Sequence, residues 1–429
     1  MSTNPFLSFA HRFSHITVVS SEGRTVCDCL DVHLDFCEIA ICENGRVRSA
    51  GRVPSSPAGI DILVRSLNAD DHVALEATGN ALQIARLLEP HVARVVVAPT
   101  KELSAITTAK VKTDRLDARK LARLLAAGLL TGCWLPDEGT RSLRRWLSRR
   151  AQLVRQRTRS KNEVHAVLMR NLKGRPPMSD VFGKGGREWL AALELPRDER
   201  LTIDGCLRHI DFVTGEIVLL EREIAQHAIG SPEIKRLMTV PGVSLMTAST
   251  FMSAVGDIHR FRRPRNVVSY LGLDPKVRQS GSGNAKIGRI SKQGSAPVRG
   301  MLVEAAFVAV STPGPMRAFY QRVSARRGKA IAIVAVARKL AVLFWHLLTA
   351  EKDYAFARPS LTAHKLRELE LRTGAKRRAG SRSLEHKSGY HQQHNRDRER
   401  EIAAQAELAY NRLVSDWKRT NPEKSAAMT

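Results

Sequence analysis

Two aspartates three residues apart are the feature of this sequence most suggestive of chemistry. Asp114 and Asp117 open a segment with helical periodicity. Residues at i and i+3 lie on one helix face, about 5–6 Å apart, so both carboxylates can point into one site. Carboxylate oxygens are ligands that Mg²⁺ prefers, and the neighbouring Arg115, Arg119 and Lys120 would hold a polyanion close. The alternative is a solvated helix start with Asp114 as its N-cap.

Two further acids lie where a sheet would bring them to this pair. Asp31 is inside an apolar, strand-like segment, and Glu76 ends another. Carboxylates that a fold brings together repel one another unless a cation lies between them. Asp31, Glu76, Asp114 and Asp117 therefore predict a metal site with Mg²⁺ as cofactor. Two such ions about 3.5–4 Å apart would activate a nucleophile and stabilise a leaving oxygen at phosphorus. The alternative is that each acid is a separate surface group.

A glycine-rich loop supplies a second reactive group. Ser280 adjoins Gly281, and its exposed, adaptable backbone would let a phosphodiester approach. Four cations of the same segment could neutralise the charge that develops at phosphorus: Arg278, Lys286, Arg289 and Lys292. No histidine or acid adjoins the serine to act as its base, so composition alone favours a phosphate-binding loop without covalent chemistry. Ser282 also adjoins Gly281 and competes with Ser280.

The order of the predicted elements places the four acids in one domain. The pattern predicts strand 25–32, strand 36–42, strand 46–53, helix 57–67, strand 72–76, helix 81–88, strand 94–97 and helix 115–127. Three meandering strands followed by alternating helix and strand is the order of a ribonuclease-H-like α/β sheet. In such a sheet Asp31 lies on the first strand, Glu76 ends the fourth, and the aspartate pair follows the fifth. The four acids would then converge on one edge of the sheet.

A strongly basic helical stretch follows from Arg141. It is amphipathic, nearly free of acids, and ends at Gly174. We expect its basic face to bind nucleic-acid backbone through Arg144, Arg145, Arg149, Arg150, Arg155 and Arg157. A second helical run covers about 202–228, and two long helices around a polar turn predict an antiparallel coiled coil or a dimerising arm. The alternative is a merely solvated basic face.

The composition also indicates a nucleic-acid partner. The 429 residues correspond to about two or three domains, and a formal net charge of +27 favours a polyanion. No membrane association is expected, because Arg338, Lys339 and His346 interrupt the longest apolar run, 330–350. The N-terminus lacks a signal-peptide pattern. We therefore expect a cytoplasmic protein that handles nucleic acid.

As a set, these motifs resemble the insertion sequence 110 family of DEDD transposases, the RuvC-like, bridge-RNA-guided serine recombinases. The resemblance covers about 25–352 and rests on motifs in the family's order: Asp31-Val32-His33, Glu76-Ala77-Thr78-Gly79, Lys112-Thr113-Asp114-Arg115-Leu116-Asp117-Ala118, Pro241-Gly242-Val243, Tyr270-Leu271-Gly272-Leu273 and Gln279-Ser280-Gly281.

The resemblance implies metal-binding acids at Asp31, Glu76, Asp114 and Asp117. It implies that Ser280 attacks a DNA phosphate and forms a phosphoserine link, with the RuvC-like site beside it from the same or another subunit. It further implies donor and target DNA as substrates, a noncoding bridge RNA that pairs with both, and a homodimer or homotetramer.

Patterns and resemblance divide the chain into a variable N-terminal arm (1–24), a RuvC-like DEDD domain (25–137), a basic coiled-coil arm (138–232), a mostly helical C-terminal transposase domain (233–352) and a basic, partly disordered tail (353–429). Asp28 and Asp35 compete with Asp31 as the first acid. Two other functions stay open: a Holliday-junction-type nuclease with water as nucleophile, and a non-enzymatic RNA- or DNA-binding scaffold.

Overall fold

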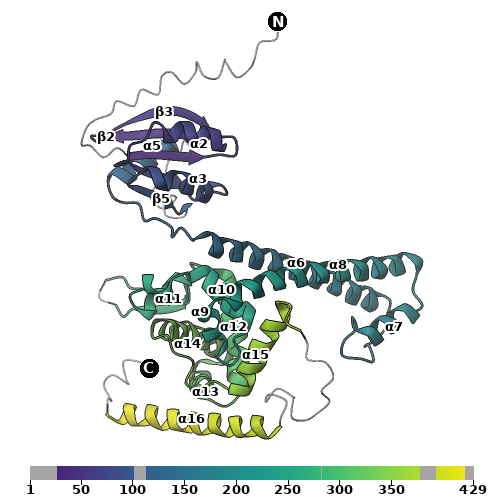
Figure 1. Cartoon of the computed structure of the whole chain (residues 1–429). Helices are drawn as coiled ribbons and strands as arrows, with labels where there is room; N and C mark the ends of the chain where they lie inside the picture. The colour runs from purple at the N-terminus through teal and green to yellow at the C-terminus, as the bar shows by residue number, and fades with distance from the viewer. Residues whose placement is uncertain (1–26, 101–112, 282, 377–392, 421–429) are drawn as a thin grey trace. The chain divides into compact units, whose positions relative to one another are not determined.

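The computed structural model describes residues 27–100, 113–281, 283–376 and 393–420, and it divides the chain into two compact units, 1–136 and 137–429. Unit 1 contains a mixed five-stranded sheet with the strand order β3-β2-β1-β4-β5 (Figure 1). Its strands are β1 (Cys27–Val32), β2 (Phe36–Glu43), β3 (Arg46–Pro54), β4 (His72–Glu76) and β5 (Arg94–Ala98). β1, β2 and β3 are antiparallel neighbours, and β4 and β5 run parallel to β1.

Local sequence accounts for this order. Asn44 and Gly45 both have positive φ, 50° and 76°, as a two-residue hairpin turn between β2 and β3 requires. The central strands β1 and β4 are buried on both faces. This explains why β4 reads as an apolar run and why both aspartates of β1 are buried. The predicted strands are thus confirmed to within two residues, apart from positions 25 and 26, which lie outside the described residues.

Helices cover both faces of the sheet. On one face, α2 (Pro57–Val64) and α3 (Ala81–Leu88) pack on Leu30, Val73 and Leu75, and a single turn of 3₁₀ helix, η1 (Glu89–His91), follows α3. On the other face, α5 (Asp114–Ala126) packs Ala118, Leu121, Ala122 and Leu125 against the sheet. Because side chains alternate along a strand, every second residue of β1 faces α5.

Unit 2 begins with two long helices that pack side by side, α6 (Glu138–Arg170) and α8 (Arg197–Ile229), with the short α7 (Lys184–Ala192) between them in sequence. They are antiparallel, because Arg150 pairs with Glu221 while Arg170 pairs with Glu199. Apolar residues at helical spacing form the seam, including Leu153 and Val213. The two predicted helices are confirmed, and the description of the pair as a coiled coil stays a prediction.

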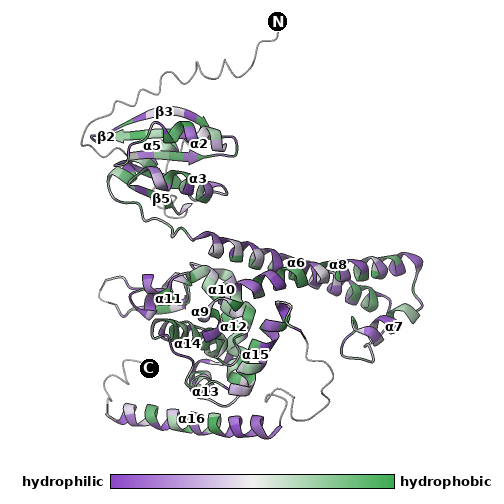
Figure 2. Cartoon of the chain, viewed as in Figure 1, coloured by the Kyte–Doolittle hydropathy of each residue, from purple (hydrophilic) through white to green (hydrophobic). Residues whose placement is uncertain are grey.

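The remaining helices of unit 2 form one apolar core. Its elements are α9 (Pro232–Met238), α10 (Leu245–Val255), η2 (Ile258–Arg260), α11 (Pro264–Tyr270), α12 (Ala296–Ser311), α13 (Pro315–Arg327) and α14 (Lys329–Thr349). Helix α14 is long and apolar enough to cross a membrane, but its Val336, Leu340 and Phe344 are buried in this core. Figure 2 shows the contrast between these apolar helices and the polar α6.

A two-stranded ribbon of β6 (Pro275–Arg278) and β7 (Lys286–Ile290) interrupts the helices. The described part of the predicted tail forms two helices, α15 (Pro359–Arg372) and α16 (Gln393–Thr420). The buried Glu407 of α16 accepts hydrogen bonds from the Gly314 amide and from Arg317 of α13. The tail therefore docks on the helical core, although its sequence is polar.

Candidate metal centre and serine ribbon

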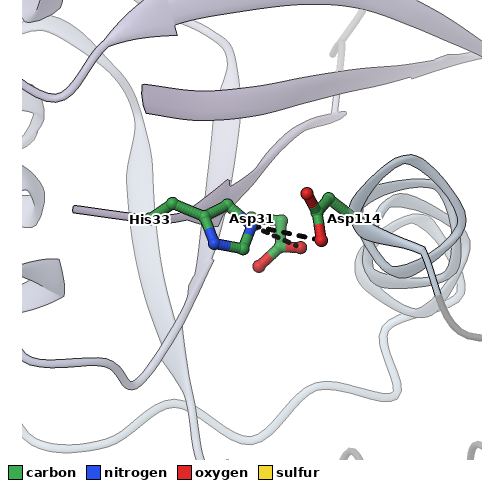
Figure 3. Close-up of side chains that lie close together, drawn as sticks. All are labelled: Asp31, His33 and Asp114. Carbon is green, nitrogen blue, oxygen red and sulfur yellow. Dashed lines mark ion pairs between the residues drawn. The ribbon is translucent and has the colours of Figure 1, made fainter. Parts of the chain in front are cut away.

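Two of the predicted acids, Asp31 and Asp114, meet at a histidine. His33 Nε2 lies 3.4 Å from Asp31 Oδ2 and 3.4 Å from Asp114 Oδ1 (Figure 3). Ligand atoms of the three side chains lie within 4.8 Å of one another. This Nε2 atom is buried, and its contacts with the two carboxylates are longer than ordinary hydrogen bonds. Three potential ligands from β1, from the turn after it and from α5 therefore converge on one point.

The start of α5 explains why Asp114 can point into this site. The N-cap of the helix is Thr113, whose side chain accepts a hydrogen bond from the Leu116 amide. Asp114 is therefore not needed as the N-cap, the role that the alternative interpretation gave it. The buried face of α5, centred on Ala118 and Leu121, fixes the helix on the sheet, and its first residue then lies over the end of β1.

Glu76 lies next to this group, at the end of the neighbouring strand. Leu30 pairs with Leu75 in the parallel register of β1 and β4, so Asp31 and Glu76 are the next residues at adjacent strand ends. Burial raises the pKa of Asp31, and the charges of Glu76 and Asp114 raise it further, while His33 acts in the opposite direction. The site thus concentrates negative charge that a cation would stabilise.

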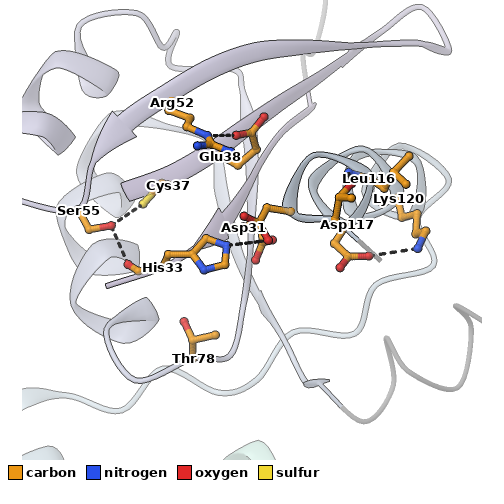
Figure 4. Close-up of polar contacts among 12 residues, drawn as sticks. Asp31, His33, Cys37, Glu38, Arg52, Ser55, Thr78, Leu116, Asp117 and Lys120 are labelled. Atoms are coloured by element: carbon orange, nitrogen blue, oxygen red, sulfur yellow. Dashed lines mark hydrogen bonds and ion pairs between the residues drawn. The ribbon is translucent and has the colours of Figure 1, made fainter. Parts of the chain in front are cut away.

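Asp117 takes a different direction from Asp114. Its Oδ1 pairs with Lys120 Nζ at 3.1 Å on the same helix (Figure 4). Arg119, also predicted to bind nucleic acid, donates a hydrogen bond to the Val47 carbonyl. Arg115 is exposed. The group of potential ligands therefore contains two of the four predicted acids, Asp31 and Asp114, and the roles of all four acids as metal ligands stay predictions.

Sequence reasoning missed a row of charged residues across three strands. Glu38 on β2 lies directly opposite Asp31, and Arg52 on β3 lies directly opposite Glu38. Arg52 Nε donates a 2.5 Å hydrogen bond to the buried Glu38 (Figure 4). This bond is the main cause that raises the pKa of Arg52, and the charge of Asp114 contributes. The signal was available, since pairing β1 and β2 about their short turn gives this register.

Asp28 and Asp35, the two alternatives to Asp31 as the first metal-binding acid, lie outside the site. Asp28 is an odd number of residues from Asp31 on β1, so it faces the opposite side of the sheet. Burial raises its pKa to about 7, Asp71 adds to the rise, and Arg48 opposes it. Asp35 is exposed in the turn between β1 and β2. Of the three candidates, Asp31 alone belongs to the cluster.

Ser280 lies at the tip of the β6–β7 ribbon in unit 2. It is exposed, and within the described residues its hydroxyl has no hydrogen-bond partner. Arg278 and Lys286 pair directly across the ribbon beside it, and both are exposed. Arg289 and Lys292 are also exposed, further along the same segment. The competing Ser282 lies outside the described residues.

The base of the ribbon is firmly attached to the helical core. Both oxygens of Asp274 accept hydrogen bonds, one from Ser269 and one from Ser291. Gly272 has a φ of +68°, and a Cβ there would lie 2.4 Å from the Gln293 carbonyl oxygen. Only glycine fits where the backbone of residue 272 passes so close to that of Gln293. The tip that carries Ser280 therefore projects from a fixed base.

The predicted basic face of α6 divides into two groups. Arg144 donates to the Ser253 and Ala254 carbonyls, Arg145 pairs with Glu138, and Arg150 pairs with Glu221. Arg149, Arg155 and Arg157 have no ion pair in the part of the chain that the structure describes. Nucleic-acid contact stays a prediction for all six, and for the first three it would require existing bonds to break.

The donor set at Asp31, His33 and Asp114 could bind a divalent cation. Carboxylate oxygens suit Mg²⁺, while the nitrogen of His33 is a ligand more typical of transition metals. The crowded carboxylates and the buried His33 Nε2, which faces two of them, are the observations that support this fit.

The sheet order and the gathered acids are consistent with an RNase H-like DEDD domain. Residues 29–171 match the transposase model for the DEDD domain of IS110 elements, and residues 234–321 match the model described as "Transposase IS116/IS110/IS902 family". The chain belongs to the IS110 family of transposases.

Relatives agree with this assignment. The chain is 30% identical to a probable family 20 transposase of Pseudomonas aeruginosa over 66% of this chain and 85% of the relative. It is 29% identical to a putative transposase of Sinorhizobium fredii over 76% and 91%, respectively. It is 26% identical to the transposase of insertion sequence element IS1111A from Coxiella burnetii over 57% and 68%. The general activity of such a protein is to cut and rejoin DNA during transposition of an insertion sequence.

Proposed function

We propose that this transposase exchanges DNA strands through a covalent phosphoserine intermediate formed by Ser280, with the acid cluster of unit 1 as its metal centre. The hydroxyl oxygen of Ser280 attacks a DNA phosphorus, the P–O bond to one deoxyribose breaks, and the serine proton leaves to a base. Attack by the released hydroxyl of the partner strand then reverses these bond changes and frees the serine. The number of phosphodiester bonds is conserved, so no nucleotide cofactor is needed.

Each group has a role that its surroundings support. Asp31, Glu76 and Asp114 would hold Mg²⁺, with His33 beside them and Asp117 as a further ligand after release from Lys120. The bound cation supplies charge stabilisation at the phosphodiester. Arg278 and Lys286 flank Ser280 on the ribbon and would bind the non-bridging phosphate oxygens. Arg115 and the exposed cations of α6 would hold the flanking DNA backbone.

The single observation that supports this function most strongly is the meeting of Asp31, His33 and Asp114 at one point in a chain of the IS110 family. A scaffold that only binds nucleic acid has no need to gather carboxylates, since they repel phosphate. We further propose that a noncoding bridge RNA selects donor and target DNA by base pairing. The net charge of +27 is ample for an RNA partner. The working unit would be a homodimer or homotetramer in the bacterial cytoplasm, close to the nucleoid.

The test is trapping of the covalent intermediate. Protein purified with its co-purifying RNA is mixed with nicked, end-labelled DNA carrying the element ends, and adducts are resolved under denaturing conditions. We expect Ser280→Ala to abolish the adduct while DNA binding is retained, and Ser282→Ala to leave the adduct in place. Asp114→Asn should also abolish it, whereas the exposed control Asp35→Asn should not. An adduct that survives Ser280→Ala contradicts the assignment.

A metal-dependent nuclease with water as nucleophile is the second candidate. It is favoured by one observation, the lack of a base beside Ser280 within the described residues. It predicts cut DNA with free ends, no adduct, and full activity of Ser280→Ala. Sequencing the RNA that co-purifies with the protein tests the guide separately, because a nuclease of this kind needs none.

A further inference from the structure

Helix α8 carries an unexplained apolar stripe on the side that faces away from α6. Its buried face includes Ile210, Val213 and Ile217. On the opposite side, Leu201, Phe212 and Leu219 are 61%, 66% and 59% exposed. Single exposed apolar residues are ordinary, but these three lie on one line along the helix.

Two glycines lie on the same line, inside the helix. A Cβ at Gly215 would meet nothing within 4 Å, and one at Gly205 only the tip of Arg208 at 3.9 Å. Glycine is the poorest helix former after proline. No close contact among the residues that the structure describes requires a glycine at either position. A neighbouring helix that approaches closely would.

The spacing of the stripe defines a regular seam. Its positions are alternately three and four residues apart, as in a coiled-coil seam: Asp198, Leu201, Gly205, Arg208, Phe212, Gly215, Leu219 and Arg222. The sequence of this seam is self-complementary about position 210. When a second copy runs antiparallel, Leu201 meets Leu219 of the other copy and Gly205 meets Gly215. Asp198 meets Arg222, and Arg208 meets the ring of Phe212, a favourable cation–π pair.

A parallel arrangement of the same two helices would be unfavourable. Asp198 would face Asp198 of the other copy, and Arg208 and Arg222 would likewise face their equivalents. Every pair of charged residues across the seam would then repel. The antiparallel arrangement turns each of these layers into an attractive one. It also places the two Gly205–Gly215 contacts next to the Phe212 rings, and the missing glycine side chains leave room for these rings.

Charge separates this face from the nucleic-acid surface. Helix α6 has ten basic and two acidic residues, whereas α8 has four basic and seven acidic ones. An acidic helix in a protein of net charge +27 repels a polyanion. Asp198 and Arg222 form no ion pair within the described ranges, so both are available to a partner.

We propose that α8 pairs antiparallel with α8 of a second copy of this chain, in the register that joins Leu201 to Leu219 and Asp198 to Arg222. The contact is isologous, so one two-fold axis near position 210 relates the copies. This gives the homo-oligomer of the proposed function a specific interface, and it does not depend on the chemistry of Ser280. The proposed function can fail while this pairing holds, and the reverse is also true.

A charge exchange between two copies tests the register. Asp198→Arg and Arg222→Asp are purified separately in the full chain, and self-association is measured by sedimentation velocity at low salt. Each variant alone acquires two repelling layers, and we expect its dimer dissociation constant to rise roughly tenfold. An equimolar mixture restores both attractive layers, so it should dimerise as tightly as the wild type. A mixture no tighter than the separate variants overturns the proposal.

The glycines provide a test in which thermal stability should increase while self-association weakens. Gly205→Gln with Gly215→Gln adds good helix formers, so the melting temperature should rise, while the dimer dissociation constant should rise roughly tenfold or more because the helices no longer approach closely. Gly300→Gln, at an exposed position in α12 where a Cβ meets nothing within 4 Å, should raise the melting temperature alone. Ser280→Ala should sediment as the wild type. Unchanged association of the double glycine variant contradicts the pairing.

Discussion

Asp28 and Asp31 lie three residues apart on β1, on opposite faces of the sheet, and we predict that a matched pair of substitutions will have different effects. Asp28 faces the side of the sheet away from Asp31, and burial raises its pKa from 3.8 to about 7. We expect Asp28→Asn to stabilise unit 1 at alkaline pH and to leave DNA strand exchange intact. Asp31→Asn should abolish strand exchange.

The sign and size of the expected change in unfolding free energy follow from proton linkage. Between about pH 4 and 7 the folded chain keeps the proton of Asp28 and the unfolded chain loses it, so stability falls as the pH rises. Above pH 7 the loss is complete, and at 1.36 kcal/mol per pKa unit it amounts to about 4 kcal/mol as an upper limit. Asparagine carries no charge at either pH. The variant should therefore match the wild type near pH 4 and exceed its unfolding free energy most at pH 8.

The assay is thermal or urea unfolding followed between pH 4 and 8.5, with strand exchange measured on the same preparations. Asp35→Asn, in the exposed turn, is the control and should shift neither curve. A stability difference between Asp28→Asn and the wild type that stays constant across this pH range would refute the argument. Loss of strand exchange in a folded Asp28→Asn protein would show that the wrong acid was placed in the site.

Three further outcomes follow from interactions elsewhere. Arg149→Ala with Arg155→Ala should lower the slope of log affinity against log salt by about one for each phosphate that is no longer neutralised, measured by fluorescence anisotropy with DNA and RNA; an unchanged slope removes these residues from the interface. Gly272→Ala should lower the melting temperature and loosen the serine ribbon, because the new Cβ would collide with the Gln293 backbone at a positive φ; a stable, fully active variant contradicts this packing. Glu407→Gln should speed proteolysis within 393–420, because the amide cannot replace the charge-assisted bond from Arg317; unchanged digestion would show that α16 is held by other interactions.

Much of the fold could be predicted from local pattern. The turn at Asn44 and Gly45 and the buried runs of β1 and β4 specify their elements through backbone sterics and hydrophobic periodicity. The charge asymmetry of α6 was equally readable, because composition needs no coordinates. The tail was harder: its polar sequence gave little sign that Glu407 would dock α16 on the helical core.

The sequence by itself determined which acids are available, which segment presents a serine among cations, and which family the motifs resemble. Tertiary structure alone decided how they are oriented. The alternation of β1 puts Asp31 and Asp28 on opposite faces, cross-strand register brings Glu38 beside Asp31, and the cap at Thr113 frees Asp114 to meet His33 while Asp117 pairs with Lys120. The physical reason is that spacing along a helix or strand fixes relative direction within one element, whereas the meeting of side chains from different elements depends on how those elements pack.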